Sequence, residues 1–363
     1  MQTRRQIFAW SAGLFVLVIL CVLVSATIGS VDIELATVAK ASLNAIPVPH
    51  GLTLGGIAVL GTTLPVPSLE FAPIFAFEVH RPHQIIVTKI RLPRILLGAT
   101  VGLSLAVAGT VMQGFFRNPL ADPSIIGVSS GAAAGAVAVL SFPFLMPTDS
   151  LPVAAFIGAL GTAFLVYAIA TRGGRTPVAT LLLAGIAVQS FLGALISYML
   201  VHSGENLRQA VVWLMGHLHA STWDDVRFAL PVILVGTVIL GAYVREMNVL
   251  LLGEEEAHHL GVNVERTKLV LLAIASLVTA AGVAVAGVIG FVGLVVPHIM
   301  RLLVGPDHRI LLPTSALAGA AFLVASDTLA RAGPVEVPVG IVTAAVGAPF
   351  FLFLLTRREV REL

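Results

Sequence analysis

The stretch LVLLAIASLVTAAGVAVAGVIGFVGLVVPHIM, residues 269–300, contains no Asp, Glu, Lys or Arg. A helix rises about 1.5 Å per residue, so roughly 20 apolar residues cross the hydrocarbon layer of a bilayer, and this run is too long for one crossing. Its segment GVIGFVG, residues 287–293, places three glycines where a turn between helices would fall. The stretch therefore predicts two membrane-spanning helices joined by a tight turn.

The whole chain has the composition of a membrane protein. Of its 363 residues 57% are hydrophobic and 11% are charged, and the mean hydropathy is +0.99. A soluble domain cannot bury that much apolar surface, so lipid must be the main solvent. The uncharged runs predict an all-α, polytopic membrane protein with ten spans: 7–28, 93–115, 124–142, 151–171, 178–201, 226–244, 267–287, 290–304, 310–330 and 338–356.

An even number of spans places both termini on the same side of the membrane. The first run is longer than the apolar core of a signal peptide, so we expect it to be retained as a helix. With a cytoplasmic N-terminus most lysines and arginines lie inside, as the positive-inside rule prefers. Residues 41–69 are also uncharged, but their prolines bracket too short a run for a crossing. We predict an apolar extracytoplasmic loop there, within an external segment 29–90.

Small residues indicate how the helices pack. Gly98 with Gly102, and Gly131 with Gly135, are four residues apart, a spacing that allows two helix backbones to approach closely. The tetrapeptide AVAG occurs at 106–109 and again at 284–287, five predicted spans later. Two segments separated by five spans run in opposite directions, as inverted repeats require.

Motifs for catalysis are weak. GVSSG at 127–131 matches the pattern of a serine hydrolase, but a proline-containing loop and an Ala/Gly-rich membrane helix surround Ser129 instead of a strand–turn–helix. The chain has no P-loop, no H-E-x-x-H motif and no Cys/His cluster, so we expect no ATP site, no resident metal and no cofactor of its own. A net charge of +2 gives no reason to expect nucleic acid as a partner.

Few ionisable residues fall within the spans. Asp327 and Arg331 are four residues apart and can pair on one helix face, and His298 is expected to be a hydrogen-bonded structural residue. A proton-coupled carrier needs a clearer relay, which disfavours ion coupling. On the outer side, His217 and His219 could contact a metal chelate, although a solvated pair of loop histidines is the simpler reading.

The stretch GEEEAHHLGV, residues 253–262, has two readings. Glu254 with His258, and Glu255 with His259, have the spacing to hold a metal ion, but each pair offers only two ligands in an open site. Alternatively, Gly253 and Gly261 bracket a short amphipathic helix, with acidic residues at its start, that forms a docking surface.

Taken together, several stretches resemble one family, the FecCD family, whose members are permease subunits of type II ABC importers for cobalamin, iron-siderophore complexes and haem. The matching stretches are RLPR at 91–94, AGTVMQGFFRNPLADPSIIGVSSGA at 108–132, LLLAG at 181–185, LGEEEAHHLGV at 252–262, GVIGFVGLVVPHIMR at 287–301, DHRILLP at 307–313 and PVGIVTAAVGAPFFLFLL at 338–355. The resemblance implies a single transmembrane permease domain over 1–363 with the inverted-repeat, ten-helix fold, located in the bacterial inner membrane. It also implies a homodimer, two cytoplasmic ATPase subunits that bind ATP and Mg²⁺, and a periplasmic binding protein.

The resemblance also assigns roles to residues. Arg91, Arg94 and Arg331 would face the periplasm and dock the binding protein. Segment 248–265 would carry the coupling helix that inserts into the ATPase, and the loop between spans four and five would form the cytoplasmic gate. The coupling residues are Gly253, Glu254, Glu255, Ala257, His258, Leu260 and Gly261, and the gate residues are Thr176, Pro177, Val178, Ala179 and Thr180.

These observations predict an ATP-driven importer permease that carries an iron chelate, with haem favoured over siderophores and cobalamin. The preference for haem depends on the outer histidines. Two alternatives remain open: an ion-coupled secondary transporter that works without an ATPase, and a membrane hydrolase that uses Ser129.

Overall fold

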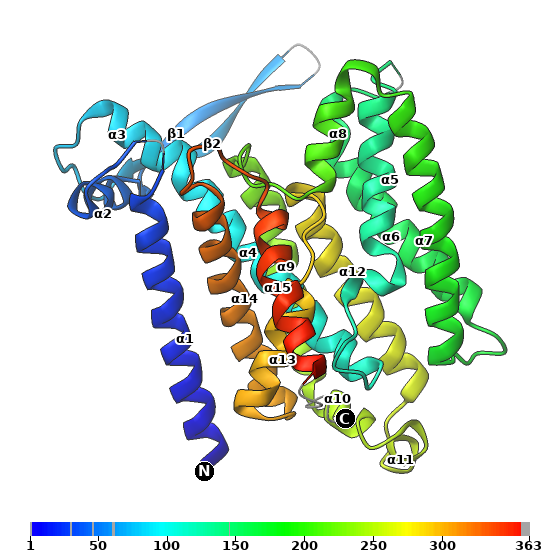
Figure 1. Ribbon diagram of the computed structural model, residues 1–363. Helices are drawn as coiled ribbons and strands as arrows, with labels where there is room; N and C mark the ends of the chain where they lie inside the picture. The colour runs from blue at the N-terminus through cyan, green and yellow to red at the C-terminus, as the bar shows by residue number, and fades with distance from the viewer. Residues whose placement is uncertain (1, 30, 46, 60–61, 145, 357–363) are drawn as a thin grey trace.

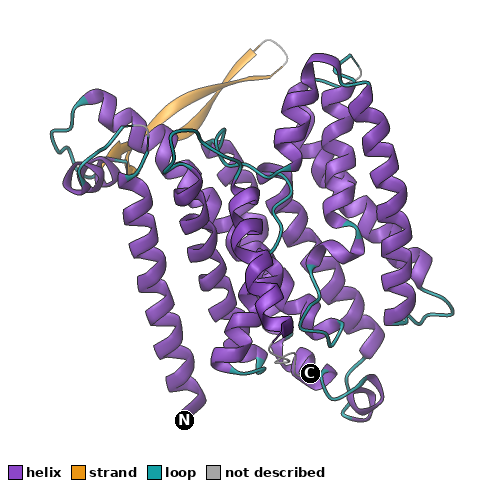
Figure 2. Ribbon diagram, in the orientation of Figure 1, coloured by secondary structure: helices purple, strands orange, loops and turns teal. Residues whose placement is uncertain are grey.

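The computed structural model describes the chain except for residues 1, 30, 46, 60–61, 145 and 357–363. The described chain is helical apart from one two-stranded hairpin (Figure 2). The longer helices are α1 (Gln2–Thr27), α4 (Leu92–Phe115), α5 (Val128–Ser141), α6 (Leu151–Ala170), α7 (Val178–Val201), α9 (Trp223–Ala242), α12 (Val264–Ala286), α13 (Val292–Val304), α14 (His308–Ala330) and α15 (Val339–Thr356). The shorter elements are α2 (Leu35–Asn44), β1 (Pro47–Val59), β2 (Thr62–Pro73), α3 (Arg81–Ile85), α8 (Leu207–Leu214), α10 (Val244–Leu250) and α11 (Glu254–His259).

The ten predicted spans each coincide with one helix of the described chain. Seven helices are long and apolar enough to cross a membrane, and one of them runs without a break from α3 through a π-helical segment, Ile86–Arg91, into α4. The three other predicted spans are the shorter apolar helices α5, α13 and α15. The expectation of an all-helical, polytopic fold is therefore confirmed.

The break predicted within residues 269–300 occurs where the glycines indicated it. Helix α12 ends at Ala286 and α13 begins at Val292. Gly287 follows α12 with φ of 71°, and a Cβ atom there would lie 2.2 Å from the carbonyl oxygen of Trp213. Only glycine fits both the left-handed backbone and this close approach, so Gly287 determines where the long apolar run divides.

Helix α4 lies at the centre of the helix bundle, with α9, α12, α13 and α14 packed around it (Figure 1). Gly102 lies against the backbone of Gly319 on α14, where a Cβ atom would come within 2.2 Å of the Gly319 oxygen. Gly131 and Gly135 pack in the same manner on α6. The predicted close approach of backbones is confirmed for Gly102, Gly131 and Gly135, but Gly98 faces the side chains of Leu218 and Val324.

The upper end of the molecule, as oriented in Figure 1, carries α2, α3 and the antiparallel hairpin of β1 and β2. Residues 41–69 thus form the end of α2 and most of the hairpin, and the described part of this segment is not an eleventh membrane-spanning helix. The sequence did not predict the hairpin, because prolines and glycines obscure the alternation of a strand.

The opposite, lower end carries α10 and α11 together with the start of α1 (Figure 1). Helices α4 and α12, which contain the two AVAG segments, run in opposite directions as predicted. The equivalence is not complete, because Gly109 lies inside α4 whereas Gly287 ends α12.

Candidate functional sites at the two faces

The upper face contains a buried network of charges at the ends of α4 and α14. The guanidinium of Arg94 donates to both carboxylate oxygens of Asp327, at 2.8–3.1 Å, and pairs with Glu336 at 2.6 Å. Arg331 donates to Asp327 at 3.1 Å, which confirms the predicted pair. Two cations and two carboxylates thus balance one another, and Arg94 and Asp327 are almost fully buried.

The same network holds α1 in place. Arg331 also donates to the carbonyl oxygens of Ser25 and Ile28, at 2.8 and 2.7 Å. Arg91 donates to the carbonyls of Ala26, Thr27 and Val31. These are the last carbonyls of α1 and of the chain after it, which lack intrahelical partners and carry the negative end of the helix dipole. The guanidinium groups therefore fasten the end of α1 to α4 and α14.

The three arginines predicted to dock a binding protein thus lie close together, but their side chains are largely buried. Arg91, Arg94 and Arg331 line a cavity of about 500 Å³ beside Glu336 and His219. Their donor groups already have partners within the chain, which the RLPR motif did not reveal. Docking through these residues stays a prediction.

His217 and His219 lie at a second upper cavity, of about 650 Å³, formed by α8 and the segment before α15. Their ring centroids are 4.7 Å apart. Burial, then the neighbouring His219 and Arg94, lower the pKa of His217 from 6.5 to about 4. The His217 ring is therefore neutral at physiological pH, and neutral imidazole is the form that coordinates metals.

His298 does not fit its predicted role. The side chain is buried on α13, yet neither ring nitrogen has a hydrogen-bond partner among the described residues. The prediction of a hydrogen-bonded ring is therefore wrong for His298. Ser129 is the second residue of α5, and Gly127 with φ of 84° precedes that helix. Ser129 therefore lies at the entry to a helix, as expected.

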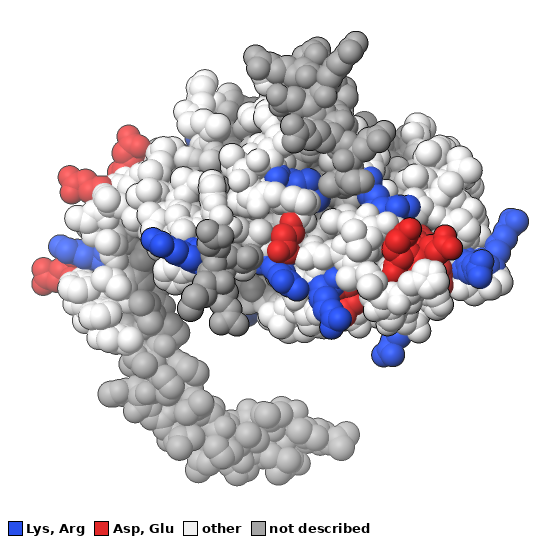
Figure 3. Space-filling model, turned by 90° about the horizontal axis from the view of Figure 1, so that it is seen from below, with Lys and Arg blue, Asp and Glu red and all other residues white. Residues whose placement is uncertain are grey.

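The lower face carries interspersed acidic and basic side chains (Figure 3). Helix α11 projects there, between α10 and α12 (Figure 1). The six residues of α11 follow Gly253, whose φ is 128°, and Gly261 follows with φ of 81°, so glycines bracket the helix as predicted.

The residues of α11 divide into two sets. Ala257 is fully buried against the protein's own core, whereas Glu254, Glu255 and His258 are exposed. Leu252 and Leu260, at the two ends of α11, are 62% and 58% exposed. Two exposed leucines on a charged surface are typical of a protein contact, since charged residues are depleted at the centres of interfaces.

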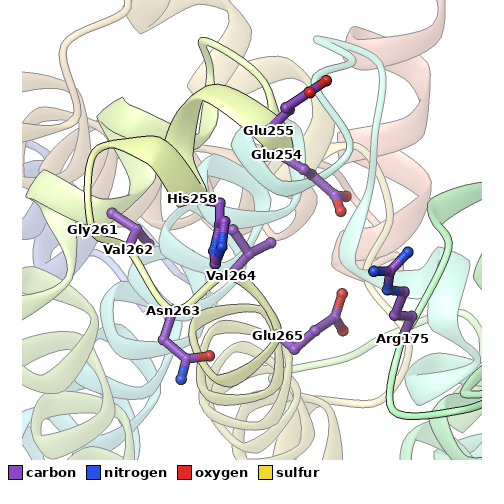
Figure 4. Close-up of a pocket in the computed structure, with 9 residues that line it drawn as sticks. All are labelled: Arg175, Glu254, Glu255, His258, Gly261, Val262, Asn263, Val264 and Glu265. Atoms are coloured by element: carbon purple, nitrogen blue, oxygen red, sulfur yellow. The ribbon is translucent and has the colours of Figure 1, made fainter.

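A cavity of about 760 Å³ lies beside α11. Glu254 comes from the helix, Glu265 from the start of α12 and Arg175 from the loop before α7, and their side chains approach the same space (Figure 4). No group of three or more His, Cys, Asp or Glu side chains with the arrangement of a metal site occurs in the described part of the chain.

The predicted gate segment lies directly behind this cavity. Thr176 is 1% exposed, and its hydroxyl lies 2.9 Å from that of Thr171. Pro177 precedes α7, and Val178, Ala179 and Thr180 form the first turn of that helix. The backbone of Thr176 is held by two residues that the sequence did not single out, Glu265 and Lys268. The only signal for Lys268 was a lysine five residues into an apolar helix.

The ten apolar helices found among the described residues, with polar networks at both faces, define a polytopic membrane protein. Comparison with known families makes this specific. Residues 16–357 match the model of the FecCD transport family, and the chain belongs to that family.

Characterised relatives support the assignment. The chain is 60% identical to the cobalamin import system permease protein BtuC of Halobacterium salinarum over the full length of both chains. It is 45% identical to the hemin transport system permease protein HmuU of Yersinia pestis, over 81% of this chain and 90% of that one. Among solved structures, it resembles "an inward-facing conformation of a putative metal-chelate type ABC transporter", with a TM-score of 0.78 and 30% identity over 96% of this chain and 98% of that one. The chain is thus a permease subunit of an ABC importer for metal chelates.

Proposed function

We propose that this chain forms the membrane passage of an ATP-driven importer that carries a corrinoid such as cobalamin. The observation behind this cargo is the 60% identity, over both whole chains, to a cobalamin import permease. The sequence favoured haem, and the comparisons do not distinguish haem from cobalamin. We favour cobalamin because similarity over the full length of a cobalamin permease is stronger evidence for the cargo than the presence of two histidines.

The second candidate cargo is haem, and one observation favours it. His217 and His219 lie together at the upper cavity, and the low pKa of His217 leaves its ring neutral. Neutral imidazole is a common ligand of haem iron. Relatives for both cargoes share the family, so the two proposals differ in substrate and not in mechanism.

The proposed assembly has two copies of this chain, two ATPase subunits on the lower face and a binding protein on the upper face. The chain would act as a single permease domain with both termini in the cytoplasm. Leu252, Leu260 and the exposed acidic residues of α11 would contact the ATPase, and Thr176–Thr180 would close the passage on that side. Arg91, Arg94 and Arg331, which line the upper cavity, would dock the binding protein as well as hold the upper ends of the helices.

Reconstitution into proteoliposomes tests the function and the cargo together. The permease and its ATPase are assembled with binding protein loaded with cobalamin, haem or a ferric siderophore, and uptake is measured with and without ATP. We expect cobalamin uptake that requires ATP and the ATPase. Uptake driven by an ion gradient without the ATPase would overturn the proposal, and haem uptake lost in His217→Gln would establish the second candidate.

A further inference from the structure

Lys268 makes contacts that join three separate segments of the lower face. It lies on the first turns of α12 and is 4% exposed. Its ammonium group contacts Glu254 of α11 at 2.9 Å, Glu265 of its own helix at 3.2 Å and the carbonyl oxygen of Thr176 at 2.9 Å. An ammonium group has three N–H donors, so these three acceptors satisfy it completely.

The gate segment is held at two points by this arrangement. Lys268 binds the carbonyl of Thr176, and the second carboxylate oxygen of Glu265 accepts the Thr176 backbone N–H at 3.1 Å. The backbone N–H and the carbonyl oxygen of Thr176 are thus both hydrogen-bonded to side chains of α12. Since Thr176 lies two residues before α7, the contacts determine where that helix begins.

Within a single chain, helix α7 has few other attachments at its lower end. Its packing partners are mainly α5 and α6, and only four of its residues are buried. By contrast, α4 is surrounded by other helices. A helix with few buried contacts can tilt at small cost, so a fixed point at its lower end decides its position.

We infer that Lys268 is the positioning residue that transmits displacement of α11 to the lower end of α7, and so links ATPase movement to opening of the passage. This inference rests on the proposed function. Glu254 belongs to the helix that would move with the ATPase, and Thr176 to the segment that would close the passage. One side chain touches both, so a displacement of one segment would act directly on the other.

The test measures ATP hydrolysed per molecule of cargo taken up, in the reconstituted complex. Lys268→Met removes all three contacts, and Glu254→Gln weakens only the contact to α11, at an exposed position where the fold tolerates change. We expect the amount of cargo taken up per ATP hydrolysed to fall roughly tenfold in both variants, within the range usual for coupling between two sites.

Three further variants sharpen the test. Lys268→Arg keeps a cation with several donors and should retain coupling. The double variant Lys268→Met with Glu254→Gln should take up as much cargo per ATP as Lys268→Met alone, because both changes break the same contact between Lys268 and Glu254. Arg266→Met, an exposed cation two residues earlier on α12, should behave as wild type.

Two outcomes would overturn the inference. One is that Glu254→Gln and Lys268→Met keep the wild-type ratio of ATP to cargo. The other is that Glu254→Gln lowers hydrolysis and uptake in parallel, which would limit α11 to holding the ATPase. A wild-type complex without ATP-driven uptake of any cargo would instead overturn the proposed function, and the inference with it.

Discussion

At the scale of single residues, buried charged side chains have different roles at the two ends of the bundle. Arg94 and Asp327 form a buried pair that fixes helices to one another. Lys268 is also buried, but its partners belong to segments that are expected to move. Charge in a helix bundle is costly, and Arg94, Asp327 and Lys268 each have at least two partners. The residue types alone would not separate these roles.

The Arg94 network predicts a large effect of substitution on stability. Arg94→Ala should lower the free energy of unfolding by about 3 kcal/mol, the lower end for a broken buried ion pair, because Arg331 still accompanies Asp327. Thermal unfolding of the purified protein in detergent measures this change.

Arg227 provides the matched control for Arg94. It pairs with Asp224 at 3.0 Å, but both side chains are exposed, so Arg227→Ala should cost at most about 1 kcal/mol. If Arg94→Ala unfolds like wild type but loses affinity for the binding protein, the docking role predicted from the RLPR motif is correct and the structural role is wrong.

At the scale of elements, the sequence predicted the helices well and their contacts poorly. Uncharged length located all ten apolar helices, and GVIGFVG located the break before α13, because hydrocarbon thickness and glycine geometry act locally. The hairpin after α2 was not predicted because prolines and glycines obscure the alternation of its strands. The partners of Arg91 were not predicted because they lie 60 to 65 residues away in sequence. The glycine-bracketed helix α11 was predicted, but not which of its residues face outward.

Helix α11 allows a prediction that separates its inner and outer faces. Leu260→Asp places a charge at an exposed apolar position, so it should weaken ATPase binding by about tenfold or more, which corresponds to about 1.4 kcal/mol, without unfolding the permease. Co-purification with the ATPase, at several protein concentrations, measures the affinity.

Ala257→Asp should behave differently, because that residue is fully buried and a carboxylate there would disturb the packing of α11. We expect a lower unfolding temperature of the permease itself. Leu260→Met, which keeps an apolar side chain, serves as the control and should bind the ATPase normally. Equal binding by Leu260→Asp and wild type would remove α11 from the proposed interface.

At the scale of the whole molecule, the two faces differ in construction. The lower face has short connections, and α11 and the gate segment meet there around Lys268. The upper face has the long segment of α2, the hairpin and α3, with arginines that tie α1 to the bundle. In the proposed importer, the lower face contacts the ATPase and the upper face receives cargo. The lower face would therefore be cytoplasmic and the upper face external.

The orientation of the molecule can be tested with single cysteines. Cys21 is the only cysteine, so a Cys21→Ser parent carries no thiol and serves as the control. Arg309 lies in the first turn of α14, which begins at the lower end, and Asp149 lies just before α6, which begins at the upper end (Figure 1). Both positions are exposed, and each is replaced by cysteine in turn. A membrane-impermeant thiol reagent added to intact cells should label Asp149→Cys alone, and Arg309→Cys should react only after the membrane is made permeable.

This expectation follows from the arginine-rich lower face, because basic residues are retained in the cytoplasm. Labelling of Arg309→Cys in intact cells would reverse the orientation, and it would place α11 and the gate segment where no ATPase could reach them.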